Sequence, residues 1–127
     1  AIDAKFVPST NEWEVFTHGG TRSTGIKVRE FAKTMEESGA GEILLTSMDK
    51  DGVKDGYDIN LLKTITQIVS IPVIASGGAG KAEHFLEAVR DGGASALLAA
   101  SVFHFHEITI SELKEFLNNS NVPMRMT

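Results

Sequence analysis

The stretch Pro72-Val73-Ile74-Ala75-Ser76-Gly77-Gly78-Ala79-Gly80 decides the fold class. Its first five residues are typical of a short buried strand, because proline fits a strand at its first position and the next residues are apolar. The next four form a glycine-rich loop. The helix that follows has an apolar face made of Ala82, Phe85, Leu86 and Val89. A strand, a loop and an amphipathic helix in this order predict a parallel α/β unit.

The same pattern occurs three more times along the chain. Residues 42–47 and 96–100 are apolar enough to be buried strands, and an amphipathic helix follows each of them. Asp58 is a good N-cap for the first of these helices. Residues 1–6 are typical of the end of a strand, and their helix carries Val28, Phe31, Ala32 and Met35 at helical spacing. Four such units predict a parallel sheet covered by helices.

A short excursion interrupts the first unit. Residues 13–17 (Trp-Glu-Val-Phe-Thr) are typical of a strand, and His18-Gly19-Gly20 has the composition of a turn. We therefore expect a hairpin between the first strand and its helix.

Four units amount to half of a (β/α)₈ barrel, which needs about 250 residues, whereas this chain has 127. An open four-stranded sheet is the alternative. Small or polar residues at the strand ends favour the barrel, because the carboxyl-terminal rim of a barrel is its catalytic face. These residues are Thr46, Ser47, Ser76, Gly77 and Ser101. We expect one α/β domain over residues 1–127, a (β/α)₄ half of a TIM barrel that a second half or self-association completes.

Composition excludes several classes of protein. Apolar residues make up 42% and charged residues 23%, which is ordinary for a globular protein, and the net charge is -5. No basic cluster and no apolar run of about 20 residues occurs, so we expect neither a nucleic-acid partner nor a membrane span. The chain has no cysteine, which is compatible with the cytoplasm. Its four histidines lack ligand spacing, so we expect no metal ion and no cofactor. It opens on Ala1, within a strand, so we expect a fragment or a processed or engineered product.

Two loops predict a phosphate site. The glycine-rich loop fits neither a P-loop nor a dinucleotide-binding motif, yet its glycines would let backbone N–H groups and a helix N-terminus approach an anion. Barrel phosphate sites often combine the loops after the last two strands with a short extra helix. Gly77-Gly78 and Ala100-Ser101 stand at those two places. A tight turn without a ligand is the alternative for the glycine-rich loop.

Three acidic positions are further candidates. Asp49-Lys50-Asp51-Gly52 fails as a calcium loop, which leaves a substrate-binding loop or a capped turn. Asp3 is close to a strand end, where a carboxylate suits general acid–base chemistry or is simply solvated. The period of two places Glu42, Leu44 and Thr46 on one face of their strand, so Glu42 would face the barrel floor if Thr46 faces the site.

Six segments in order carry a family resemblance: residues 1–5, 16–20, 39–47, 49–52 with 56–58, 75–80 and 99–105. Together they resemble the C-terminal half of the cyclase subunit of imidazole glycerol phosphate synthase, from histidine biosynthesis. Residues 16–20 and 102–105 favour this cyclase over the sister isomerase of the same pathway, which is the alternative.

The resemblance implies a barrel lyase that uses ammonia to convert a phosphoribulosyl-formimino aminoimidazole carboxamide ribotide into imidazole glycerol phosphate and aminoimidazole carboxamide ribotide. It implies a glutaminase partner on the barrel floor, with Glu42 at the ammonia entrance and Asp3 as one of two catalytic acid–base residues. The substrate- and phosphate-binding positions that it implies are Thr46, Asp51, Gly52, Ser76, Gly77, Gly78, Ala100 and Ser101.

The other half of the cyclase has no counterpart here. One aspartate cannot supply both proton transfers on opposite sides of a substrate, so we expect little or no activity from the isolated chain. Two free sheet edges and an open apolar face would favour a homodimer that rebuilds a barrel from two copies. A phosphate-binding homodimer without catalysis is therefore a second expectation.

Overall fold

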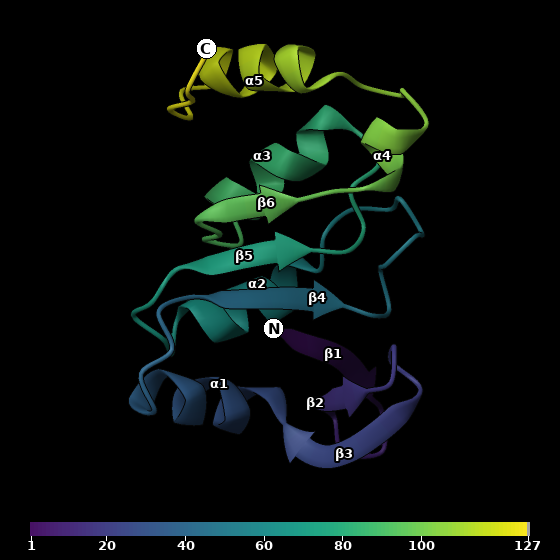
Figure 1. Cartoon of the computed structure of the whole chain (residues 1–127), viewed down its shortest axis with the longest axis vertical. Coiled ribbons are helices and arrows are strands. Elements are labelled where there is room, and N and C mark those ends of the chain that lie inside the picture. Colours follow the sequence, from purple (N-terminus) through teal and green to yellow (C-terminus); the bar gives the residue numbers. More distant parts are fainter. Residues whose placement is uncertain (127) are drawn as a thin grey trace.

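The computed structural model describes residues 1–126, so Thr127, the last residue of the expected domain, lies outside the described residues. The strands are β1 (Ile2–Val7), β2 (Glu12–Thr17), β3 (Arg22–Lys27), β4 (Ile43–Ser47), β5 (Val73–Ser76) and β6 (Ala96–Leu98). The helices are α1 (Val28–Glu37), α2 (Ile59–Thr66), α3 (Ala82–Arg90), α4 (Ser101–His104) and α5 (Ile110–Asn119). Figure 1 shows one continuous sheet with the β2–β3 hairpin at one end and α5 at the other.

The sheet has the order β3-β2-β1-β4-β5-β6. Strands β1, β4, β5 and β6 are mutually parallel, while β2 and β3 pair antiparallel. A helix follows each of β4, β5 and β6, with α4 as a short extra turn before α5, and α1 follows β1 after the β2–β3 hairpin. The prediction of four parallel strand–helix units is confirmed, and the fold is that of half a TIM barrel. Within residues 1–126 no helix has the length and apolar content of a membrane span.

Several boundaries differ from the sequence-based expectation. Strand β4 begins at Ile43, so Glu42 precedes it, and β5 begins after Pro72. Strand β6 ends at Leu98 rather than Ala100, because the Ala100 carbonyl already accepts hydrogen bonds from the amides of the α4 turn. Strand β3 was not expected at all. Its sequence Arg-Ser-Thr-Gly-Ile-Lys lacks the alternation of a half-buried strand, and its pairing with β2 holds it in place.

The hairpin changes which sheet edges are open. Two free sheet edges were expected from four parallel strands alone, but residues Asp3–Val7 of β1 pair with β2, so the terminal strands of the sheet are β3 and β6. The carboxylate of Asp49 accepts a hydrogen bond from the Phe6 amide at 2.8 Å, and Phe6 packs edge-on against Trp13. These contacts fasten the hairpin and the loop after β4 to the same end of β1.

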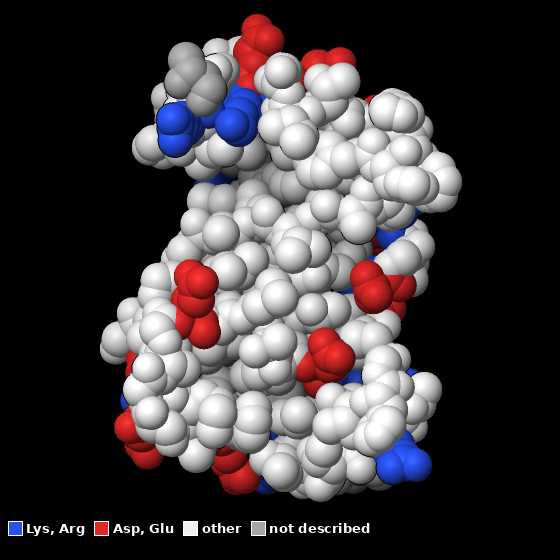
Figure 2. Space-filling model, viewed as in Figure 1, with Lys and Arg blue, Asp and Glu red and all other residues white. Residues whose placement is uncertain are grey.

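The two faces of the parallel sheet have different environments. Ile43 and Leu45 of β4 and Val73 and Ala75 of β5 are buried on the face that α2 and α3 cover. In Figure 1 these helices lie behind the strands, so the open face is turned toward the viewer. Figure 2 shows that face as mostly uncharged, with a few separate acidic side chains. A closed barrel would enclose this face.

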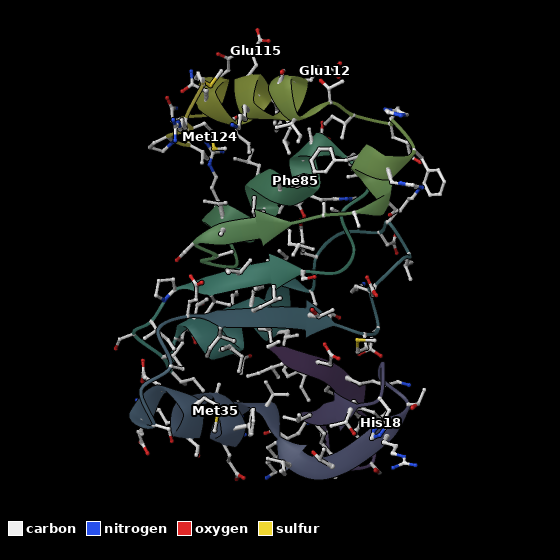
Figure 3. All side chains as sticks on the ribbon, viewed as in Figure 1. His18, Met35, Phe85, Glu112, Glu115 and Met124 are labelled. Atoms are coloured by element: carbon white, nitrogen blue, oxygen red, sulfur yellow. The ribbon has the colours of Figure 1, made fainter. Side chains whose placement is uncertain are left out.

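Three aromatic residues, Phe85, Tyr57 and Phe103, form a cluster at the core. Phe85 of α3, labelled in Figure 3, is 2% exposed. Its ring centroid is 5.7 Å from that of Tyr57 and 6.0 Å from that of Phe103. These three residues come from α3, α4 and the loop after β4. Their packing therefore holds together the elements next to the polar residues at the strand ends.

Candidate functional site

Four side chains form a row across the open face of the parallel sheet. The strand register places Asp3 beside Thr46, Thr46 beside Ser76, and Ser76 beside Leu98. Thr46 and Ser76 lie at the carboxyl ends of β4 and β5, as expected. Asp3 does not end its own strand, because β1 continues to Val7 to pair with the hairpin. The register nevertheless brings its half-buried side chain level with the other strand ends.

A cavity of about 140 Å³ lies where β5 and β6 end. This volume is about ten times that of the smallest cavity that holds one water molecule. Seven of the residues expected to bind substrate or phosphate line it: Asp51, Gly52, Ser76, Gly77, Gly78, Ala100 and Ser101. Thr46 neighbours Ser76 in the row, whereas Glu42 is exposed at the opposite, amino-terminal end of β4. The remaining lining residues are Lys54, Ala79, Leu98 and Ala99.

Close packing of the loops requires glycine at two positions in the cavity wall. Gly77 and Gly78 have φ of +92° and +116°, where other residues are strained. A Cβ atom on Gly78 would lie 2.1 Å from the Gly56 carbonyl oxygen, and one on Gly77 would lie 2.7 Å from the Ser47 carbonyl oxygen. The Gly78 carbonyl accepts a hydrogen bond from the Gly56 amide at 2.8 Å. The loop after β5 is thus locked onto the loop after β4.

Three of the residues that line the cavity have backbone amides available to donate hydrogen bonds to a ligand. Within residues 1–126 no protein acceptor receives a hydrogen bond from the amides of Gly77, Gly78 or Ser101. Grouped amides of this kind favour an anion. The start of α3, also expected to face an anion, is already occupied, because the His84 Nδ1 accepts from the Gly80 and Lys81 amides at 2.9 and 3.2 Å. An anion in the cavity would therefore be bound by the loop amides and by the segment that begins α4, and not by the start of α3.

The loop after β4 is held in place by its acidic residues. Asp58 accepts from the Leu61 amide at 3.0 Å, which confirms it as the N-cap of α2, and from the Trp13 indole at 3.3 Å. Asp49 is bound to the Phe6 amide. Asp49 and Asp58 thus hold the loop in place, whereas Asp51 lines the cavity within the described part of the chain.

Tyr57 was not singled out from the sequence, yet it joins the two halves of the cavity. Its side chain is 5% exposed, and its hydroxyl donates a hydrogen bond to the Leu98 carbonyl at 2.9 Å. This bond connects the loop after β4 to the last residue of β6, directly before the lining residues Ala99 to Ser101. The partners are 41 residues apart, so no local sequence pattern indicates the contact.

Replacing Tyr57 with phenylalanine should lower the free energy of unfolding by about 1–2 kcal/mol, because the Leu98 carbonyl loses a buried partner. Urea denaturation at neutral pH measures this loss.

Burial also raises the pKa of the Tyr57 hydroxyl above its usual value near 10. The stabilisation from its protonated form is therefore complete below pH 10 and declines at higher pH. Since Tyr57 is the only tyrosine in the chain, tyrosinate absorbance should appear only as the protein unfolds. A normal titration near pH 10 in the folded protein would contradict this prediction.

Comparisons with known proteins agree with this arrangement. A family model described as "Histidine biosynthesis protein" matches residues 1–109. Imidazole glycerol phosphate synthase subunit HisF from two strains of Caulobacter vibrioides, NA1000 / CB15N and ATCC 19089, is 56% identical to this chain over 126 residues. The alignments cover 99% of this chain and 48% of each relative, so the chain spans about half the length of the curated relatives it matches. The chain belongs to the histidine biosynthesis protein family.

Proposed function

We propose that this chain is the C-terminal half-barrel domain of a cyclase subunit of imidazole glycerol phosphate synthase, acting in the cytoplasm. The observation that supports this most strongly is that the Asp3–Thr46–Ser76 row and the glycine-lined cavity lie together at the carboxyl-terminal end of the parallel strands. Barrel enzymes place their active sites at that end of the strands. The identity to subunits named as this synthase favours the cyclase over the sister isomerase.

In this proposal the two parts of the site have different tasks. The amides of Gly77, Gly78 and Ser101 bind one phosphate group of the substrate, with Gly52 and Ala100 closing the cavity around it. Asp51, Thr46 and Ser76 line the path from that phosphate to the row. Asp3, at the far end of the row, transfers a proton at the reacting centre.

Glu42 takes part in the delivery of ammonia. It is exposed at the amino-terminal end of β4, opposite the cavity, where a glutaminase partner would dock on the barrel floor. Its distance along the strand from Thr46 is consistent with an entrance at one end of the barrel and chemistry at the other. We assign no metal ion and no cofactor to this reaction.

Turnover requires the other half of the barrel, because a second acid–base residue is needed. The experiment is to mix the chain with the separately produced N-terminal half of a relative and to supply the substrate and ammonia. Turnover by the mixture and its near absence in either half alone would support the proposal. A mixture that associates but does not turn over would contradict it.

A phosphate-binding homodimer without catalysis is the second candidate, and the open sheet face favours it. Leu98 and Ala96 are exposed there, and β6 is a terminal strand of the sheet. An apolar face and an unpaired strand edge favour association, and a two-fold pair is the commonest homo-oligomer. The occupant in this proposal is a second copy of the chain.

Light scattering at micromolar concentration should give the mass of two chains, and added phosphate should raise the midpoint of thermal unfolding. Leu98→Lys should convert the dimer to a monomer, because it puts a charge on the open face. Val53→Lys is the matched control, since Val53 is exposed in the loop after β4 and should tolerate the charge. A wild-type mass of one chain would contradict self-association.

A further inference from the structure

The cavity proposed to bind phosphate is also lined by a lysine, Lys54, which no sequence motif indicated. Lys54 is the one Lys or Arg residue among the cavity-lining residues in the described chain. Its backbone is fixed in the left-handed region at φ +64°, and a Cβ atom on Gly80 would lie 2.2 Å from the Lys54 carbonyl oxygen. The start of its side chain is therefore held at the cavity wall by the loop after β5.

The Lys54 ammonium contacts the segment that follows α4. It forms an ion pair with Glu107 and lies 5.2 Å from the centroid of the Phe105 ring. Both partners are tied to α4, because the Phe105 amide donates to the Ser101 carbonyl at 3.0 Å and the Glu107 amide to the Val102 carbonyl at 3.0 Å. The ion pair thus lies over the same short helix whose first residue, Ser101, lines the cavity.

The charges in the cavity favour a cation when a phosphate binds. A phosphate group carries up to two negative charges, and the Asp51 carboxylate is already part of the lining. Backbone amides provide only partial charges. Lys54 has a long, flexible side chain, and its ion pair with Glu107 is partly exposed, with 32% and 40% of the two side chains accessible. Such pairs are weak enough to exchange partners.

We propose that Lys54 leaves Glu107 to bind the phosphate group of the ligand, and that Glu107 competes with the phosphate for this lysine. This inference rests on the phosphate site proposed above and adds a charged residue to it. The competition predicts that two substitutions in one ion pair will change phosphate affinity in opposite directions. A purely structural ion pair would instead make both substitutions weaken binding or leave it unchanged.

The test is calorimetric titration of the full chain with inorganic phosphate at low ionic strength. Lys54→Gln should weaken binding about tenfold, as expected for the loss of a charge-assisted hydrogen bond. Glu107→Gln should tighten binding about threefold, because the competing carboxylate is removed. In the double variant, Glu107→Gln should add no gain, since the lysine that it releases is absent. Lys54→Arg should retain most of the affinity.

Matched variants control for the change in net charge. Lys63→Gln on α2 and Glu115→Gln on α5 alter exposed residues, and Figure 3 shows Glu115 pointing away from the sheet. Both should bind phosphate as the wild-type chain does. Equal affinities for the wild-type and Lys54→Gln chains would overturn the role of Lys54 and leave the phosphate site intact. No affinity gain in Glu107→Gln would overturn the competition, even if Lys54→Gln fails to fold. No binding by the wild-type chain would overturn both proposals.

Discussion

The Gly78→Ala chain is expected to lose at least about 3 kcal/mol of unfolding free energy and to bind phosphate much more weakly than the wild-type chain. Two costs add at this position. An alanine is strained at φ +116°, and its Cβ atom would lie 2.1 Å from the Gly56 carbonyl oxygen. The Gly56 backbone cannot move away without breaking its amide hydrogen bond to the Gly78 carbonyl. Urea denaturation gives the stability loss, and phosphate titration gives the change in affinity.

Gly19→Ala separates the two costs. Gly19 also has a positive φ, +68°, but a Cβ atom added there would meet no heavy atom within 4 Å. This variant should lose only the conformational part, about 1–2 kcal/mol, and bind phosphate normally. Equal losses in the two variants would mean that the close approach of Gly56 and Gly78 contributes nothing. The cavity wall would then be less rigid than its contacts indicate.

The parts of the fold that could be predicted from sequence are those set by local patterns. The spacing of Val28, Phe31, Ala32 and Met35 correctly placed α1, since burial of one helical face follows from a period of 3.6 residues. Asp58 was identified as an N-cap because its side chain bonds to an amide only three residues away. Strand β3 was missed because its stability comes from its partner β2 rather than from its own residues.

In the candidate site, too, features set by local sequence patterns could be predicted, and contacts between distant residues could not. Strand ends and glycine-rich loops were visible in the sequence, and the structure brings most of the positions chosen from them into one cavity. Tyr57, His84 and Lys54 were not assigned their contacts. The partners of Tyr57 and Lys54 are 41 and 53 residues away, so only the folded chain brings them together. His84 lies four residues from the Gly80 amide, and a histidine at that distance from a glycine-rich loop is a local signal that could have indicated the cap.

The Asp3→Asn chain, mixed with the N-terminal half of a relative, is expected to lose turnover by about 10²–10⁴-fold while binding phosphate and the other half normally. Asparagine keeps the shape of the side chain but cannot exchange a proton near neutral pH. Asp3 lies on the open face, and its position in the strand register depends on backbone pairing with Thr46 rather than on its carboxylate. The substitution should therefore leave the fold unchanged. Initial rates with saturating ammonia measure the loss directly.

Asp91→Asn controls for the loss of one negative charge, because Asp91 is exposed at the end of α3, outside the row and the cavity. It should turn over at the wild-type rate. Full activity in the Asp3→Asn complex would show that another group transfers the proton. Asp51 is then the next candidate on this half of the rim, because it is the carboxylate that lines the cavity in the described chain. Asp51 lies beside the amides proposed to bind phosphate, whereas Asp3 lies at the far end of the row. Proton transfer by Asp51 would therefore place the reacting centre closer to β5 and β6.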